Sequence, residues 1–284
     1  VGAFVSDSTF VVSSSGTDNA GCVSLPQNND CNTIQYIFDN VDLTGGYTIR
    51  VDDNQTLTAD IVFGSNDSGT TGNPLILEGL NNQVTIDGNS AVSNVIDTSG
   101  EDHLIIRNLR ITGSTSRGVF VQSNGGEPLD EIELDNLYIY ENDGVGLHIK
   151  GSSATNNIAN NAITVTDCSF VDNGNHGAFT GGHTGATAPV TYTNCTATNN
   201  TWHGFSSKSE EELLTGGGNW GTGNDYDHDI SNESRSGETI YRVTNETTGA
   251  IGTEVACGAL DANNEWCQDG DTLYWYHDTT DPDT

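Results

Sequence analysis

The sequence TDCSFVDNGNHGAFTGG, residues 166–182, is followed by a close variant of itself, TNCTATNNTWHGFSSK, residues 193–208. Cys168 corresponds to Cys195 and Asn173 to Asn200, and the dipeptide His-Gly at 176–177 recurs at 203–204, in each case 27 residues later. Self-similarity at a period of 20 to 50 residues is typical of repeat architectures. The stretch therefore indicates, first of all, one coil of a solenoid, and only secondarily a functional site.

The repeat extends toward the N-terminus, where RNLRITGS and DNLYIYEN align with TDCSFVDN and TNCTATNN. The alignment keeps three columns in step through intervals of 28, 31 and 27 residues. The first column holds Asn108, Asn136, Asp167 and Asn194, the second Ser114, Asn142, Asn173 and Asn200, and the third Gly118, Gly146, Gly177 and Gly204.

Within each coil the apolar residues alternate with polar ones, as in LIIRNLRI at 104–111 and EIELDNLYIY at 131–140. Period two indicates strands whose apolar side chains point inward. Stacked coils then pair equivalent strands in parallel, about 4.8 Å apart. We expect Asn142, Asn173 and Asn200 to hydrogen-bond to one another as a ladder at a corner that needs a left-handed backbone, and the glycines to fit the next bend.

These columns, with the opening FVVSSSGTDNAG…CNTIQYIFDNV and the later SGTTGNPLILEG…QVTIDG, resemble the pectate-lyase-like right-handed parallel β-helix superfamily. The resemblance covers roughly residues 8–208 and implies an all-β right-handed parallel β-helix with capped ends. Members of that superfamily include lyases, hydrolases, epimerases, phage tailspikes and surface proteins without catalytic activity. A shared fold does not decide among them.

Three regions follow from this comparison: an N-terminal cap or entry segment at 1–45, parallel β-helix coils at 46–209, and a C-terminal loop and β-rich cap at 210–284. Six cysteines fit an extracellular chain. Proximity in sequence favours disulfides between Cys22 and Cys31 and between Cys257 and Cys267. Cys168 and Cys195 would stack in adjacent coils, either as a third disulfide or as two buried thiols.

The composition limits partners and location. Forty Asp and Glu residues against eight Lys and Arg residues give a net charge of -32, which repels nucleic acid and anionic membranes. No apolar run approaches the roughly 18 residues of a membrane helix. The chain lacks Met and begins at Val1, which predicts a mature secreted protein after signal-peptide removal. We expect an extracellular or cell-surface location.

One face of the stack gathers three of the eight Lys and Arg residues and three of the seven His residues. The superfamily resemblance implies a substrate groove there, with a Lys or Arg base and a cation such as Ca²⁺, and it nominates Lys150 or Lys208 as base and Arg117 as charge neutraliser. The acidic Ca²⁺ ligands expected of a lyase are missing from these columns. The candidate substrate-binding residues on this face are Phe120, His148, His176, Phe179, Trp202 and His203.

The sequence contains two candidate metal sites. Asp225, Asp227 and Asp229 alternate in a Gly-rich loop, a spacing that suits calcium, although Ile230 replaces the Gly of an EF-hand loop. The alternative interpretation of this loop is a solvated acidic segment. His176 and His203 should stack about 5 Å apart, either as ligands of one shared ion or simply as small polar residues at a corner.

Two functions therefore stay open. The first is a structural or interaction protein of the cell exterior that self-associates into an oligomer, a fibre or a surface layer, because solenoid ends suit head-to-tail assembly. The second is a polysaccharide lyase or glycoside hydrolase acting on an acidic glycan at the face of Arg117, Lys150 and Lys208.

Overall fold

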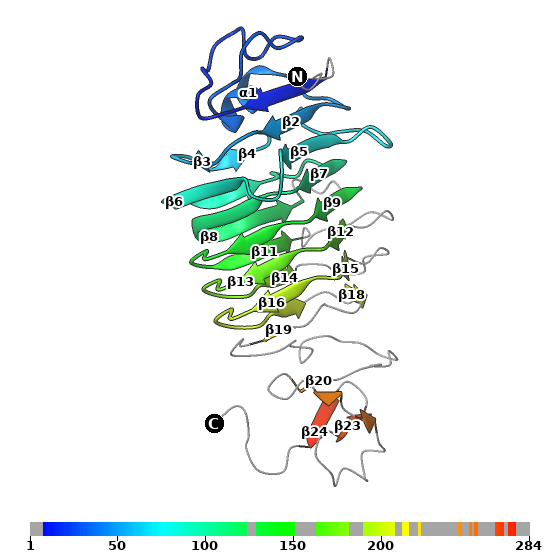
Figure 1. Ribbon diagram of the computed structural model, residues 1–284. Coiled ribbons are helices and arrows are strands. Elements are labelled where there is room, and N and C mark those ends of the chain that lie inside the picture. Colours follow the sequence, from blue (N-terminus) through cyan, green and yellow to red (C-terminus); the bar gives the residue numbers. More distant parts are fainter. Residues whose placement is uncertain are drawn as a thin grey trace. The chain divides into compact units, whose positions relative to one another are not determined.

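A computed structural model describes residues 8–123, 129–150, 163–181 and 190–207 of the chain. Beyond these it describes the backbone of short strands within 212–276. Contacts divide the chain into two units, residues 1–228 and residues 229–284. The first unit is a stack of strand-rich coils, as Figure 1 shows for the blue to yellow part of the chain.

One wall of the stack is an eight-stranded, entirely parallel sheet in which each strand pairs with its equivalent in the next coil. Successive strands of this wall come from successive coils, so the sheet runs along the stack. In order, they are β1 (Thr9–Val12), β2 (Thr48–Val51), β5 (Leu75–Gly79), β7 (Leu104–Arg107), β9 (Ile132–Asp135), β12 (Ile163–Thr166), β15 (Val190–Thr193) and β18 (Glu212–Thr215).

The second sheet has eleven strands and supplies the remaining walls. Its two long strands bend, so that β8 pairs with β10 near its start and with β11 near its end. Its members are β3 (Gln55–Thr56), β4 (Ile61–Val62), β6 (Thr85–Asp97), β8 (Arg110–Gln122), β10 (Tyr138–Tyr140), β11 (Val145–Lys150), β13 (Ser169–Val171), β14 (Ala178–Gly181), β16 (Thr196–Thr198), β17 (Phe205–Ser207) and β19 (Gly221–Thr222).

This pairing confirms the parallel β-helix that the repeat columns predicted. The column of Ile111, Ile139, Phe170 and Ala197 is in register across four strands. Parallel pairing begins at β1 and reaches β19, a wider span than the predicted 46–209.

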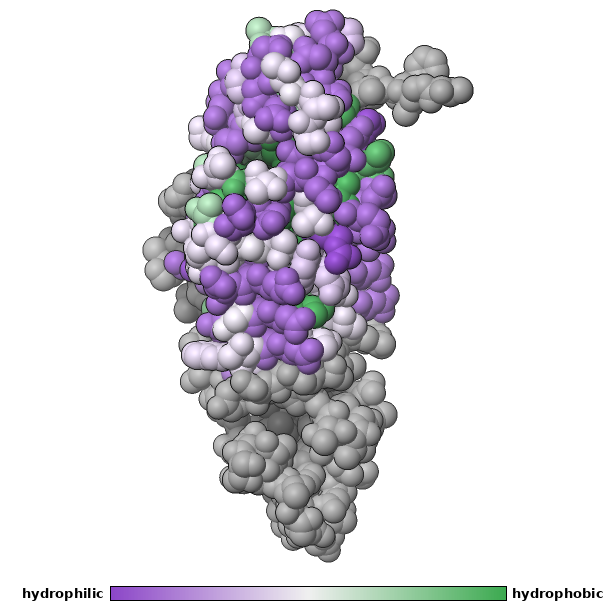
Figure 2. Space-filling model, turned by 60° about the vertical axis from the view of Figure 1, so that its left-hand side comes forward, coloured by the Kyte–Doolittle hydropathy of each residue, from purple (hydrophilic) through white to green (hydrophobic). Residues whose placement is uncertain are grey.

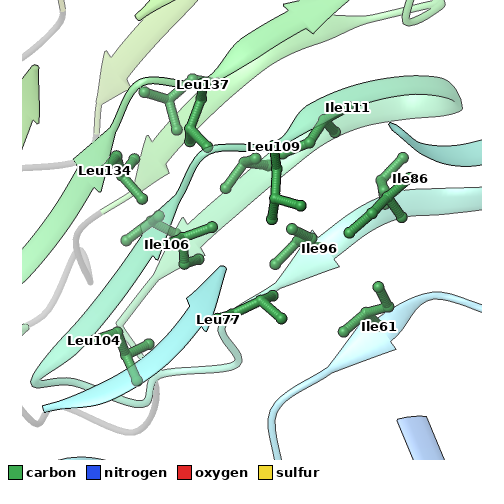
Figure 3. Packing of buried hydrophobic residues seen from close by; sticks show 14 of the residues in the cluster. Ile61, Leu77, Ile86, Ile96, Leu104, Ile106, Leu109, Ile111, Leu134 and Leu137 are labelled. Carbon is green, nitrogen blue, oxygen red and sulfur yellow. The ribbon is translucent and has the colours of Figure 1, made fainter. Parts of the chain in front are cut away.

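The core lies inside the coils and consists mainly of branched aliphatic side chains. Ile111, Ile139 and Phe170 are 0% exposed, and Figure 3 shows Ile106, Leu109 and their neighbours pointing into the same interior. Each such side chain contributes about 1.5–3 kcal/mol through removal of apolar surface from water. The strand period therefore fixes which side chains remain outside to form a site.

The predicted asparagine ladder is present. The side-chain amide of Asn142 donates to Oδ1 of Asn173 over 3.0 Å, and that of Asn173 donates to Oδ1 of Asn200 over 2.9 Å. The backbone N–H groups of Ser114, Asn142 and Asn173 donate to the same series of oxygens. The ladder thus satisfies buried backbone groups at one corner of every coil that it joins.

The left-handed backbone does not fall where it was expected. It lies at the residue before each ladder asparagine, with φ of 50° at Glu141, 54° at Asp172 and 56° at Asn199. It also recurs in the first column, at Asn108, Asn136, Asp167 and Asn194. The ladder residues were therefore placed correctly as hydrogen-bonding groups, but the prediction that they themselves supply the left-handed corner is wrong.

The third column needs glycine because backbone atoms of adjacent coils lie very close together there. A Cβ at Gly146 would lie 2.5 Å from the carbonyl oxygen of Gly177 and 2.9 Å from the side-chain nitrogen of Asn173. Gly118 and Gly177 face the same pair of obstacles in their own coils. A side chain at these positions would not fit between adjacent coils.

The N-terminal segment closes the first edge of the eight-stranded sheet. Helix α1 (Ile34–Asn40) is capped by Thr33, whose side chain accepts from Tyr36 N–H. The amide of Gln27 bonds both the N–H and the C=O of Val11 in β1, as a neighbouring strand would. Cys31 N–H also donates to Val11 C=O. The edge of β1 is therefore already occupied.

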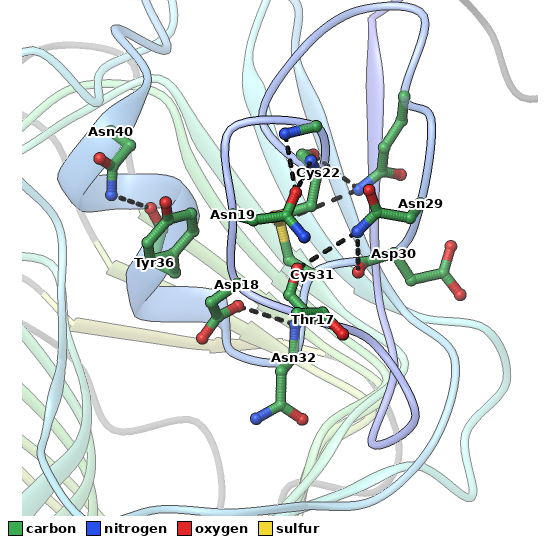
Figure 4. The surroundings of a disulfide bond; sticks show 12 residues. Thr17, Asp18, Asn19, Cys22, Asn29, Asp30, Cys31, Asn32, Tyr36 and Asn40 are labelled. Carbon is green, nitrogen blue, oxygen red and sulfur yellow. Dashed lines mark hydrogen bonds between the residues drawn. A yellow bond between two sulfur atoms is a disulfide. The ribbon is translucent and has the colours of Figure 1, made fainter.

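The predicted disulfide between Cys22 and Cys31 holds this segment, and both cysteines are fully buried (Figure 4). Cys168 and Cys195 are buried free thiols, so the second of the two predicted arrangements is the one present. Burial, with a hydrogen bond to Cys195, raises the pKa of the Cys168 thiol. The side chains of Cys257 and Cys267 lie outside the described residues.

In the second unit, short strands pair among themselves. Strands β20 (Thr244–Asn245) and β21 (Ala250–Ile251) are antiparallel. Strand β22 (Thr253–Glu254) is parallel to β23 (Glu265–Asp269), which pairs antiparallel with β24 (Thr272–Tyr276).

Candidate functional site

The parallel register brings a continuous series of rings onto one outer face, formed by β8, β11, β14 and the segment before β17. Phe120, His148 and Phe179 are direct strand partners, with ring centroids 5.1 and 4.9 Å apart. The series continues through His176, which lies 5.1 Å from Phe179, 5.0 Å from His203 and 5.5 Å from Trp202. We call these six residues the ring column.

The members of the ring column differ in accessibility. Phe120 is 7% exposed and His176 9%, whereas Trp202 is 48% exposed. Leu80, at 53%, is the other exposed large hydrophobic side chain among the described residues. The face drawn in Figure 2 is mostly hydrophilic, with hydrophobic residues in small separate patches. A ligand would therefore reach the column chiefly at Trp202.

The predicted basic residue Arg117 is fixed by its neighbours. Its Nε donates to Nδ1 of His148 over 2.8 Å, and its guanidinium carbon lies 4.2 Å from the ring centre of Phe120. One of its terminal nitrogens also lies 3.4 Å from Oδ1 of Asn94. Burial lowers the pKa of Arg117, opposed by the charge of Asp97. Arg117 orients His148 and covers Phe120.

His148 is held neutral by this arrangement. Burial, followed by the positive charges of Arg117 and Lys150 and by His176, lowers its pKa to about 3. Because Arg117 donates to Nδ1, that nitrogen carries the lone pair and the proton sits on Nε2. The local field is thus positive on a chain whose net charge is -32.

A pH titration by nuclear magnetic resonance tests this assignment. We expect the folded protein to keep His148 neutral, protonated on Nε2, down to about pH 3, whereas the urea-unfolded chain titrates near pH 6.5. Since only the unfolded state takes up this proton between those values, His148 makes the fold less stable as the pH falls from 6.5 toward 3. A folded-state titration of His148 near pH 6.5 would contradict the Arg117 contact.

Lys150 is exposed at the end of β11, where its strand partners are Gln122 and Gly181. It is on the same face as the ring column but makes none of the ring contacts. Lys208, the other nominated base, lies outside the described residues.

The paired histidines do not form a ready ion site. The rings of His176 and His203 are stacked within 10° of parallel. An imidazole binds a metal ion in the plane of its ring, so two stacked parallel rings cannot direct lone pairs at one ion without turning. His176 and His203 therefore contribute to the site as members of the ring column.

Metal-binding side chains converge at one place in the part of the chain that the structure describes. One group there brings three candidate metal-binding atoms together, Asp18 with Cys22 and Cys31, but those cysteines form the disulfide. The predicted calcium ligands Asp225, Asp227 and Asp229 lie outside the described residues. A shallow hollow of about 320 Å³ lies on the eight-stranded sheet beside Ile105 and Glu133, away from the predicted site residues.

Two contributors to the site were missed in the sequence. Asn94 on β6 contacts Arg117, and Asp97 on β6 accepts from the amide of Gln122 over 3.2 Å. The pairing of β6 with β8 has register shifts between Asp87 and Asn94. These shifts break the spacing that would have aligned β6 with the four repeats, so no column could reveal either residue.

Comparisons with known proteins give a limited result. No protein-family model matches the chain, and no curated protein matches it. Among solved structures it is similar to one described as the crystal structure of pectate lyase Pel9A, with 14% identity over 81% of this chain and 73% of that chain, at a TM-score of 0.47. The strand pairing described above identifies the fold by itself. The fold is a parallel β-helix.

Among the described residues, no α-helix is long and apolar enough to cross a membrane.

Proposed function

We propose that this β-helix is an extracellular interaction protein that holds a polysaccharide against the ring column without cleaving it. The observation that carries the proposal is the exposed indole of Trp202 at the end of a continuous series of rings. Aromatic faces offer large, rigid contact area, and sugar rings present apolar C–H faces that pack against them. Parallel coils repeat such positions about every 4.8 Å, which suits an extended polymer.

The geometry favours binding of a polysaccharide over its cleavage. A lyase needs a base beside the substrate and cations to neutralise its carboxylate. Arg117 already contacts His148, Phe120 and Asn94. The described residues supply no carboxylate cluster for Ca²⁺ beside the ring column. One observation supports the lyase as second candidate, namely that burial lowers the pKa of Arg117.

An exterior location is supported by the Cys22–Cys31 disulfide, because such bonds persist in oxidising surroundings, and by the net charge of -32. Self-assembly into fibres through added strands would need an open sheet edge. Within the described residues the edge of β1 at Val11 is taken by Gln27 and Cys31. We therefore place polysaccharide binding ahead of fibre formation.

Removal of the exposed indole tests the proposal. In affinity electrophoresis and calorimetry against a panel of neutral and acidic polysaccharides, we expect Trp202→Ala to bind its preferred polymer about 10-fold more weakly, as loss of about 1.4 kcal/mol implies. Leu80→Ala removes a side chain of similar exposure elsewhere and should bind like the wild type. Both variants should keep the wild-type melting temperature.

Equal binding by the Trp202→Ala and wild-type proteins would refute the ring column as the binding surface. Release of unsaturated products, followed by absorbance at about 235 nm, would show instead that the lyase alternative is right. Arg117→Gln would then abolish that release if Arg117 takes part in the reaction.

A further inference from the structure

Acidic side chains are abundant in this chain, but only some of the described Arg side chains form ion pairs with them. Arg50 pairs with Asp52 over 2.6 Å, and Arg107 pairs with Glu78 over 2.7 Å. Arg110, at the start of β8, makes no ion pair and no side-chain hydrogen bond with any described residue. Arg117 also makes no ion pair among the described residues, but unlike Arg110 it donates hydrogen bonds, to His148 and Asn94.

Arg110 instead lies on two aromatic rings. Its guanidinium carbon is 4.4 Å from the ring centre of Tyr138, its direct strand partner, and 5.2 Å from that of Tyr140. The two tyrosine rings are 5.0 Å apart on the outer side of β10. A cation over an aromatic ring is held by the charge distribution of the ring and not by a hydrogen-bond acceptor, so the N–H donors of Arg110 can still bind an acceptor.

One described carboxylate lies on the outward face beside Arg110, but it forms no ion pair with it. The next outward residues below Tyr138 are Ser169 and Thr196, which hydrogen-bond to each other over 3.1 Å. The nearest acid along the neighbouring strand is Asp87, whose Oδ1 accepts from the N–H of Asn89. The half-buried guanidinium therefore has five donors and no described acceptor.

We propose that Arg110, Tyr138 and Tyr140 form a second binding site, for a sugar residue that carries an oxyanion. The guanidinium N–H groups bind the carboxylate or sulfate oxygens as a fork, and the tyrosine rings pack against the sugar ring. This site involves β10, whereas the ring column involves β11 and β14. The inference does not rest on the proposed function, since none of its three residues belongs to the ring column.

The net charge of -32 sets the conditions for a test. Long-range repulsion opposes any anion that approaches this protein, but at 0.3 M NaCl charges more than about 6 Å apart are largely screened. A contact between Arg110 and an oxyanion at hydrogen-bond distance is screened much less. Binding should therefore be measured at 0.3 M NaCl, where the local site dominates.

Titrations of ¹³C-tyrosine-labelled full-length protein with disaccharides report on this site directly. The probes are a uronate disaccharide, a sulfated disaccharide, a neutral disaccharide and inorganic sulfate. We expect the signals of Tyr138 and Tyr140 to shift with at least one anionic disaccharide and about 10-fold more weakly, or not at all, with the neutral one. The uronate and sulfated probes decide which oxyanion the site prefers.

Arg110→Gln should weaken binding of the anionic disaccharide at least 10-fold, and Arg110→Lys should recover part of it. Arg50→Gln, which removes an ion-paired arginine, should leave it unchanged. Unchanged affinity in Arg110→Gln, even with a lowered melting temperature, would show that Arg110 only braces the tyrosines and would overturn the proposal. Equal binding of inorganic sulfate and the sulfated disaccharide would overturn the role of the tyrosine rings.

Discussion

Replacing Gly146 with alanine should lower the free energy of unfolding by about 3 kcal/mol or more. The new Cβ would lie 2.5 Å from a backbone oxygen of the next coil, at Gly177, and 2.9 Å from the Asn173 side chain. Neither obstacle can move alone, because the oxygen belongs to a paired strand and the amide belongs to the ladder. The coils would have to separate at this point, which weakens pairing along the stack.

Urea unfolding followed by circular dichroism measures this effect. Gly72→Ala serves as the control, because Gly72 has a φ of +72° and a methyl group added there would meet no other atom within 4 Å. Gly72→Ala should lower the free energy of unfolding only by the backbone strain, about 1 kcal/mol. If Gly146→Ala costs no more than Gly72→Ala, the close spacing of the coils at this column is not as described.

Replacing Asn173 with leucine should destabilise the fold by about 4 kcal/mol, since buried polar groups lose their partners at about 1–3 kcal/mol each. Asn173 is 1% exposed and lies in the middle of the ladder. Its amide donates to Asn200 and to the carbonyl of Ile139, and its oxygen accepts from Asn142. Leucine has similar volume but supplies none of these bonds.

The comparison with Asn136→Gly isolates the ladder from the corner. Asn136 is half-buried, has a φ of 50° and donates to Asn108, so glycine there keeps the backbone and loses one partly exposed bond. We expect a cost of about 1 kcal/mol or less. Similar melting temperatures for Asn173→Leu and Asn136→Gly would show that the ladder adds little to stability.

The repeat made most of the fold predictable. A side-chain period of two and three columns in step are properties of the chain itself, so strand pairing such as Ile139 with Phe170 followed from alignment alone. The ladder was predictable because equivalent asparagines in adjacent coils stack closely enough to hydrogen-bond to one another. The left-handed residue before each ladder asparagine was not, because Glu141, Asp172 and Asn199 share no residue type that marks it.

The candidate site was predictable as a face but not as a set of contacts. The parallel register placed Phe120, His148 and Phe179 together, as the columns indicated. The alternation did not reveal that Phe120 is nearly buried, because the covering group is Arg117, three residues away in the same strand. Side-chain packing across the surface of a sheet depends on rotamers, which the repeat does not fix.

The site at Arg110 shows the same limit. Arg110 stood in the aligned repeat, but nothing in the alignment marked it as different from Arg107, which finds Glu78 on the neighbouring strand. Their different partners follow from which wall each occupies. Arg107 lies in the eight-stranded sheet beside acidic positions, and Arg110 lies beside tyrosines in the other sheet.

Binding of a polysaccharide at the ring column, without cleavage, can be measured in one experiment. The protein is incubated with the polysaccharide it retains best, and both the bound fraction and the chain length of the recovered polymer are then determined, the latter by light scattering. For the wild-type protein we predict saturable binding and an unchanged polymer length. For Trp202→Ala we predict an affinity about 10-fold lower, again with the polymer length unchanged. A shortened polymer, or no retention of any polysaccharide in the panel, would contradict the proposed function.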